Sequence, residues 1–309
     1  PRYARDDGFR IRTLLLGTAA VLLSWIPAAA QTPQNPSPMV ETTRVHERIA
    51  KEVPPGERAD LDALGEDIRI FLPAAFERAE DVALVVHYLG AAWLPEVAAA
   101  RQGVPVAIVT VRSAEGPELE MILNEAARWL APRRIASVHL TAFSAGYRGI
   151  RSVLRSPAAD RVDGILLLDG LHASYVPERK VLAEGGAIDM TDIEPFIAFA
   201  RRAVARERRM VIIHSTIFPG TFASTTETTD ALVAALGLER TPVLEWGPRG
   251  MQQLSRVESG CLRILGFAGN SGPDHIDQFH AIPEMLAVLL SNCGSEATRA
   301  EGAPEGSRW

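Results

Sequence analysis

The chain has 309 residues, of which 47% are hydrophobic and 23% are charged, and its formal net charge is −6. These values are ordinary for a globular protein, and the length suits one large domain with its own core. A negative net charge without a long run of Lys or Arg argues against a nucleic-acid-binding protein. Arginines do gather at 201–202 and within 206–209, but on a predicted helix, where they indicate a solvated face.

Residues 1–30 have the pattern of a secretory signal. A basic flank precedes the uncharged stretch 13–30, which ends in three alanines. We therefore expect cleavage before Gln31 and a secreted or periplasmic protein. The alternative is an uncleaved anchor, but Gly17 and Pro27 interrupt the apolar stretch, and a membrane span needs about 20 apolar residues. No stable membrane insertion is expected after cleavage.

The next region, 31–55, is predicted to be a linker or N-terminal extension, because its first part is rich in Pro, Gln and Asn. Residues 56–293 are predicted to form one domain, and 294–309 a disordered C-terminal tail. Within the domain, apolar runs predict strands at 68–72, 82–87, 104–111, 134–143, 162–168, 210–214, 241–246 and 261–267. Apolar residues at helical spacing predict helices at 117–131, 147–154, 193–208, 224–237 and 276–290.

Continuous apolar strands that alternate with amphipathic helices are typical of an α/β fold. Its central sheet is mostly parallel, and helices cover both faces. In such sheets ligands bind beyond the carboxyl ends of the strands. The residues that directly follow each strand are therefore the first candidates for a functional site.

The most informative segment is Ala142-Phe143-Ser144-Ala145-Gly146, which joins the strand 134–143 to the helix 147–154. A serine flanked at two residues on each side by small residues, between a strand and a helix, is the pattern of a nucleophile elbow. The sharp turn strains the serine backbone and exposes its hydroxyl. Alanine replaces the usual glycine two residues before Ser144.

Two further polar residues follow later strands. Asp169 comes directly after 162–168, and His275 ends the loop after 261–267. A serine hydroxyl needs a base within hydrogen-bond reach, and that base needs a carboxylate to orient it. The sequence therefore predicts Ser144 as nucleophile, His275 as base and Asp169 as the orienting acid.

With these three residues in this order, the chain from about 67 to 290 resembles the α/β-hydrolase family. The resemblance implies an α/β-hydrolase fold and a secreted esterase-like or lipase-like serine hydrolase. It also implies an oxyanion hole with one donor at the backbone N–H of Ala145. The second donor comes from the loop after 82–87, where Tyr88 and Leu89 are the candidates.

The acid and the base each have an alternative. In the family the acid more often follows the next strand, here 210–214, but no acid occurs there before Glu227, which a capping box already explains. Glu227 and Asp230 remain the alternatives to Asp169. His280 is the alternative base, although it lies inside the last predicted helix.

Aromatic residues near the predicted turn are candidates for the substrate pocket: Trp93, Tyr147 and His172. Core packing is the alternative for the first two. The strand histidines are predicted to be buried core residues: His87, His139 and His214.

No cofactor is expected, because the sequence has neither a dinucleotide glycine motif nor a P-loop. His275 and His280 together with Asp274 or Asp277 could be read as metal ligands. Nothing else completes that ligand set, so no metal is expected.

The two cysteines, Cys261 and Cys293, are expected to pair, because export would place them in an oxidising compartment. A bridge would close a loop of about thirty residues and stabilise the fold by about 3–4 kcal/mol in the chain-entropy model. Two buried free thiols are the alternative.

The sequence thus predicts a secreted carboxylesterase that cleaves small-molecule or polymer esters through an acyl-enzyme. A peptidase or amidase of the same fold is the first alternative, because both use the same triad. A non-catalytic binding protein on this scaffold is the second. The segment 170–192 is long enough to form a small flap.

Overall fold

The computed structural model describes residues 46–291. The predicted signal 1–30, the tail 294–309 and Cys293 lie outside the described residues, so the signal and the Cys261–Cys293 bridge stay predictions. Between residues 46 and 291, no helix is both long enough and apolar enough to cross a bilayer.

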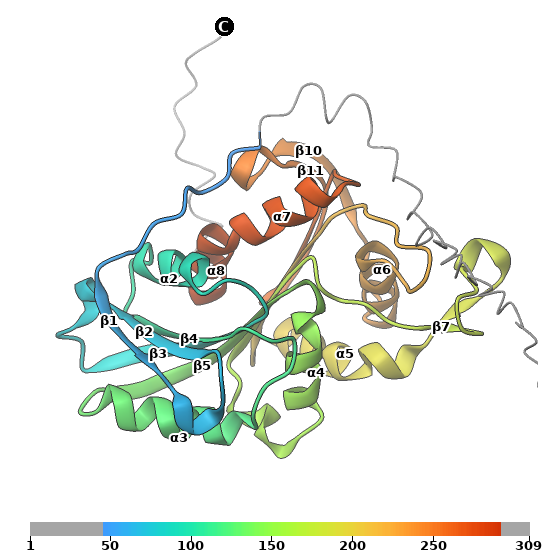
Figure 1. The fold of residues 1–309 in the computed structure, drawn as a ribbon. Coiled ribbons are helices and arrows are strands. Elements are labelled where there is room, and N and C mark those ends of the chain that lie inside the picture. The colour runs from blue at the N-terminus through green and yellow to red at the C-terminus, as the bar shows by residue number, and fades with distance from the viewer. Residues whose placement is uncertain (1–45, 292–309) are drawn as a thin grey trace, which may run out of the picture. The chain divides into compact units, whose positions relative to one another are not determined.

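A ten-stranded sheet forms the centre of the domain (Figure 1), in the order β1-β2-β4-β3-β5-β6-β9-β12-β11-β10. The central strands run parallel: β4 (Val106–Val111), β3 (Asp81–Tyr88), β5 (Arg134–Phe143), β6 (Gly164–Leu168), β9 (Arg209–His214) and β12 (Leu262–Phe267). The outer strands are antiparallel: β1 (Gly56–Asp60), β2 (Ile68–Pro73), β11 (Gln252–Ser259) and β10 (Thr241–Trp246). The predicted, mostly parallel sheet is confirmed.

Helices cover both faces of this sheet (Figure 1). One face carries α2 (Trp93–Ala100), α7 (Gly272–His280) and α8 (Ile282–Leu290). The other carries α3 (Leu119–Leu130), α4 (Tyr147–Leu154), α5 (Met190–Val204) and α6 (Thr225–Ala235). Every residue of β6 is buried, because helices exclude water from both of its faces. The predicted α/β-hydrolase fold is confirmed by this strand order and layering.

The helix predicted at 276–290 is in fact two helices, α7 and α8, which meet at Ala281. The break follows from Pro283, because proline lacks a backbone N–H and is tolerated only in the first turn of a helix. Two strands of the ten-stranded sheet were not predicted, β1 and β11, nor was the separate pair β7 (Tyr175–Val176) and β8 (Ala187–Ile188). Strands β1 and β11 are both rich in polar residues and lie towards the ends of the strand order.

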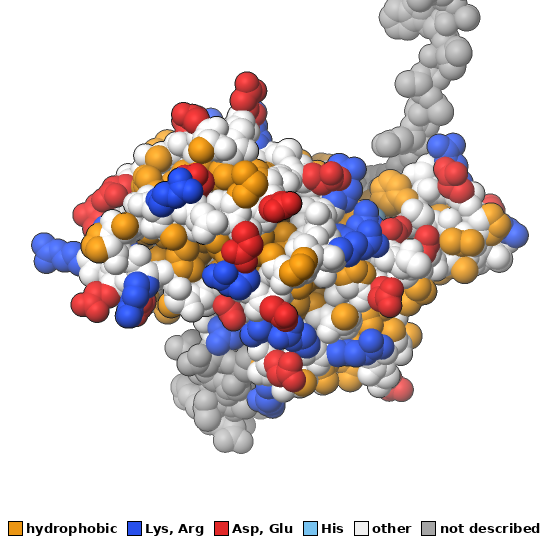
Figure 2. All heavy atoms as spheres, turned by 90° about the horizontal axis from the view of Figure 1, so that it is seen from below, with side chains coloured by type: hydrophobic (Ala, Val, Ile, Leu, Met, Phe, Trp, Pro, Cys, Tyr) orange, Lys and Arg blue, Asp and Glu red, His pale blue; other side chains and the backbone are white. Residues whose placement is uncertain are grey.

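The face over α3 and α4 carries interspersed acidic and basic side chains (Figure 2). Arg202 pairs with Asp160 at 3.0 Å and with Glu207 at 3.4 Å, and Arg161 pairs with Glu120 at 3.2 Å. The pairs of Arg202 agree with the solvated helix face predicted for 201–202. The arginines within 206–209 are not on that helix, because α5 ends at Val204 and Arg209 begins β9.

Candidate active site

Three neighbouring strands, β3, β5 and β6, each lead into a residue with left-handed backbone geometry. These residues are Leu89 (φ 67°), Ser144 (φ 51°) and Asp169 (φ 46°). Left-handed geometry is uncommon for residues other than glycine and costs about 1–3 kcal/mol where the surroundings impose it. Such strain clusters at functional sites, so the carboxyl edge of these strands is the candidate site.

The serine turn is closely packed on two sides. Ser144 opens a single 3-10 turn, η3 (Ser144–Gly146), that leads into α4. A Cβ at Gly146 would lie 2.3 Å from the Tyr88 carbonyl oxygen, and a Cβ at Gly170 would lie 2.3 Å from the Ser144 carbonyl oxygen. Glycine is therefore required at both positions. Gly170 brings the loop that carries Asp169 directly against the serine.

Asp169 and His275 are hydrogen-bonded, with 2.6 Å between Oδ2 and Nδ1. The aspartate is 2% exposed and the histidine side chain 26% exposed. Burial alone would raise the pKa of the Asp169 carboxyl, but the hydrogen bond and charge of His275 and the bonds from Ser215 lower it to about 2. The carboxylate is therefore ionised and accepts a hydrogen bond from Nδ1–H, so in the neutral imidazole the lone pair lies on Nε2.

Two residues that the sequence analysis missed hold the same carboxylate. The Ser215 N–H donates to Asp169 Oδ1 at 2.9 Å, and its hydroxyl donates to Oδ2 at 2.8 Å. The Thr225 hydroxyl donates to Oδ1 at 2.9 Å. Ser215 directly follows β9, at the strand end where the family more often has its acid. A hydroxyl residue at that strand end was the available signal.

Ser144 lies next to this pair but is not bonded to it. The His275 ring centroid is 4.5 Å from that of Phe143, the residue before the serine. Among residues 46–291, the Ser144 hydroxyl makes no hydrogen bond. Catalytic hydrogen bonds are often long without substrate and tighten only in the complex. The three predicted residues thus share one neighbourhood, with Asp169 and His275 in contact.

The three residues predicted as oxyanion-hole donors differ in whether their backbone N–H is free. Ala145 lies in the first turn of η3, where backbone N–H groups have no partner within the helix. The Leu89 N–H instead donates to the Val111 carbonyl at 2.9 Å, so its prediction as a donor is wrong for this arrangement. Tyr88 is paired on both sides within β3, and its ring packs on Gly149.

The next residue along this loop is Gly90, with a positive φ of 136°. Among the described residues, its N–H has no hydrogen-bond acceptor. Gly90 is therefore a better candidate for the second donor than either residue that the sequence suggested.

Three side chains form an aromatic wall, Tyr147, His172 and Phe222, and Tyr147 opens α4 directly after the serine turn. The His172 ring lies edge-on to Tyr147 at 5.7 Å and to Phe222 at 4.8 Å, and its Nδ1 bonds the Ala223 carbonyl at 3.0 Å. Burial lowers the pKa of His172, and both Asp169 and His275 act on it electrostatically. Phe222 was not predicted.

Trp93 is not part of this wall. Its ring contacts His280 at 5.9 Å, at the start of α2 on the opposite face of the sheet. Core packing, the alternative that the sequence left open for Trp93, therefore fits its position better than a place in the substrate pocket.

The alternative acids and base are engaged elsewhere. Glu227 completes the predicted capping box of α6 and accepts the Tyr175 hydroxyl at 2.8 Å, and Asp230 pairs with Arg240. His280 Nδ1 accepts the Ile49 N–H at 3.0 Å. The strand histidines are buried as predicted, and burial lowers their pKa to about 4: His87, His139 and His214.

No protein-family model matches the chain, and no curated protein matches it. Among solved structures, it is similar to a carboxylesterase from Bacillus subtilis, with 10% identity and a TM-score of 0.42 over 76% of this chain and 92% of that one. A poly(3-hydroxybutyrate) depolymerase from Bordetella parapertussis has 12% identity and a TM-score of 0.40 over 76% and 89% of the two chains. A thermostable esterase from Pseudomonas putida has 10% identity and a TM-score of 0.42 over 79% and 86%. The strand order and the strained serine turn, rather than these similarities, identify the chain as a protein with the α/β-hydrolase fold.

Proposed function

We propose that this chain is a serine hydrolase that cleaves carboxylic esters through an acyl-enzyme. The observation that carries the proposal is the 2.6 Å hydrogen bond between Asp169 and His275, next to a serine on a strained turn. A buried carboxylate that holds an imidazole beside such a hydroxyl is the arrangement that activates a serine nucleophile.

In the first half of the reaction, Ser144 Oγ attacks the ester carbonyl carbon and its proton moves to His275 Nε2. The bond between the carbonyl carbon and the leaving oxygen breaks, and that oxygen takes the proton from the imidazolium. In the second half, water attacks the acyl carbon and gives a proton to Nε2. The acid leaves, and Ser144 recovers its proton. Asp169 stays ionised throughout, because its pKa is about 2.

The tetrahedral intermediate needs donors for its oxyanion. Ala145 N–H supplies one of them, and Gly90 N–H supplies the second in place of Leu89. Gly146 packs against the Tyr88 carbonyl, which keeps the loop of Gly90 next to the serine turn. Both donors belong to the backbone, so they would be in position before substrate binds.

The aromatic wall of Tyr147, His172 and Phe222 offers an apolar surface to the acyl or alcohol group of the ester. Phe222 is 41% exposed, so this surface opens to solvent and is not enclosed. An open apolar surface suits small-molecule esters or the exposed esters of a polymer. Substrates whose apolar chains need a deep tunnel are not favoured.

Active-site labelling with a fluorophosphonate tests the proposal. We expect one label per chain on Ser144 and none in Ser144→Ala. Ser259→Ala is the matched control, because Ser259 ends β11 far along the chain from the serine turn, and it should label as the wild type does. Labelling that persists in Ser144→Ala would contradict the proposed nucleophile. Nitrophenyl esters compared with peptide anilides then separate an esterase from an amidase.

A further inference from the structure

A short segment at the start of the described chain, 46–49, is fastened to helix α7. Arg48 Nε donates to Asp277 Oδ1 at 2.9 Å, and Arg48 Nη2 donates to the Pro273 carbonyl at 3.0 Å. The Ile49 N–H donates to His280 Nδ1 at 3.0 Å. The segment thus contacts the first turn, the middle and the end of one helix. The sequence predicts a linker or N-terminal extension at 31–55, and the structure shows that 46–49 contacts α7.

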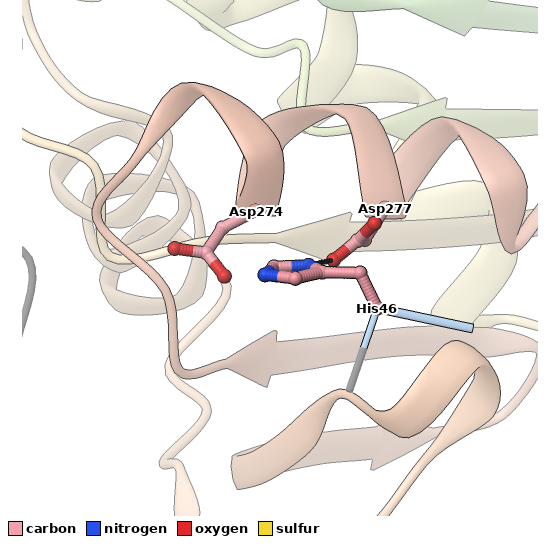
Figure 3. Close-up of side chains that lie close together, drawn as sticks. All are labelled: His46, Asp274 and Asp277. Carbon is pink, nitrogen blue, oxygen red and sulfur yellow. Dashed lines mark hydrogen bonds and ion pairs between the residues drawn. The ribbon is translucent and has the colours of Figure 1, made fainter. Parts of the chain in front are cut away.

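The centre of this contact is a buried carboxylate. The side chain of Asp277 is fully buried, and His46 Nδ1 and Arg48 bond its two oxygens. Figure 3 shows the His46 ring lying between Asp274 and Asp277, with its bond to Asp277 drawn. Removing one partner of a buried ion pair is strongly destabilising, because it leaves a buried charge uncompensated. The Asp277 carboxylate therefore holds 46–49 in place strongly.

These side chains could also be read as cation ligands, since atoms of His46, Asp274 and Asp277 lie within 4.8 Å of one another. The donors already present favour an ion pair. One oxygen of the Asp277 carboxylate is already paired with the positively charged Arg48 guanidinium. Asp274 Oδ2 accepts the Asn270 N–H at 3.0 Å, and the Ser271 N–H and hydroxyl at 3.1 and 2.7 Å, as the cap of α7.

Helix α7 also carries His275. This residue lies between Pro273 and Asp277, the two residues of α7 that Arg48 contacts. If the contacts of 46–49 with α7 were lost and the helix shifted, the imidazole of His275 would move relative to Ser144. A misplacement of about 1 Å costs on the order of 100-fold in rate.

We infer that His46 and Arg48 are positioning residues for the reaction: by clamping Asp277 they fix helix α7, and through it the distance between His275 and Ser144. The inference rests on the proposed function. It assigns a catalytic consequence to a segment that lies 226 or more positions before His275 in the sequence. The aromatic wall belongs to other elements, so substrate binding should change little when the clamp is removed.

The test compares full-length variants. Arg48→Ala combined with Asp277→Asn removes a cation and an anion together, so no buried charge is left alone. Arg48→Lys keeps the charge and one contact. The matched control is Glu52→Ala. Glu52 lies in the same part of the chain as Arg48 but pairs with Arg101, the C-cap residue of α2, so this variant removes an ion pair without touching α7. Circular dichroism checks that each variant is folded.

We expect kcat on a nitrophenyl ester and the fluorophosphonate labelling rate to fall about 10–100-fold in the double variant. KM should stay within about twofold of the wild-type value, since the aromatic wall is intact. Arg48→Lys should keep much of the wild-type kcat, because it retains the positive charge beside Asp277. Hydrogen exchange of the backbone amides of α7 should become faster in the double variant and stay unchanged in Glu52→Ala.

Each contrary result is distinct. Unchanged exchange in α7 would overturn the clamp, and it can be measured even if the wild type is never labelled. Faster exchange with an unchanged labelling rate would overturn the positioning role while leaving the proposed function intact. One divalent cation per chain, found by metal analysis and lost in Asp277→Asn, would replace the clamp by a cation site. A wild type that no fluorophosphonate labels would instead overturn the proposed function and, with it, the positioning role.

Discussion

The two ends of helix α7 place the same side chain in two different surroundings. Near the start, His275 Nδ1 faces the Asp169 carboxylate, which can only accept a hydrogen bond, so Nδ1 carries the hydrogen and the lone pair of the neutral ring lies on Nε2. At the end, His280 Nδ1 faces the Ile49 N–H, which donates, so the hydrogen must be on Nε2. Burial lowers the pKa of His280, which keeps it neutral. The partner of Nδ1, not the residue type, decides which histidine can act as a base.

The largest effect that this contrast predicts is on turnover. Ser144→Ala and His275→Ala should each lower kcat by about 10⁴–10⁶, because members of a triad act as a unit. His280→Gln keeps an acceptor for the Ile49 N–H and should stay within about tenfold of the wild type. Steady-state hydrolysis of a short nitrophenyl ester measures all three. A larger loss in His280→Gln than in His275→Ala would reverse the assignment.

Asp169→Asn should lower kcat by about 10⁴ with the fold intact, because an amide no longer holds the productive tautomer of His275. Glu227→Gln is the control, since Glu227 caps α6 and contacts neither His275 nor Asp169. The same ester assay serves for both variants. If Asp169→Asn turned over substrate at the wild-type rate while Glu227→Gln did not, the acid would have to be reassigned.

A smaller effect concerns the residues that hold the carboxylate. Ser215→Ala should lower the free energy of unfolding by about 2 kcal/mol at pH 7, because it removes a buried hydrogen bond to a charged group. Thr225→Val should have a similar effect, since it also removes one bond to Asp169. Urea denaturation gives both values. Wild-type stability in either variant would mean that its hydroxyl does not hold the carboxylate.

The pH dependence of stability sharpens the same point. The pKa of Asp169 is lowered in the folded chain from 3.8 to about 2, so the ionised carboxylate stabilises the fold above pH 4. That stabilisation, about 2 kcal/mol, is lost as the pH falls from 4 to 2. The difference in unfolding free energy between wild type and Asp169→Asn should fall over this window. A difference that is independent of pH would contradict an ionised, hydrogen-bonded Asp169.

Much of the site could be predicted because its residues directly follow apolar strands. The buried run of β6 ends at Leu168, so Asp169 is placed at the carboxyl edge by its position alone. The same holds for Ser144 after β5. Periodicity and strand ends are local signals, and a local signal is enough when the fold collects all strand ends at one edge.

The clamp on α7 could not be predicted in this way. His46 and Arg48 meet Asp277 across more than 200 residues, and polar contacts of this kind leave no periodic pattern in the sequence. The prediction of Leu89 as the second oxyanion donor was wrong for a related reason. Whether the Leu89 N–H is free depends on the neighbouring strand, and its bond to Val111 is visible only in three dimensions.

The most direct measurement is the labelling of Ser144 by a fluorophosphonate in three proteins side by side: wild type, His275→Gln and His280→Gln. The account predicts one label on Ser144 in the wild type and in His280→Gln, and no labelling on the same timescale in His275→Gln. Labelling that survives in His275→Gln and disappears in His280→Gln would contradict it.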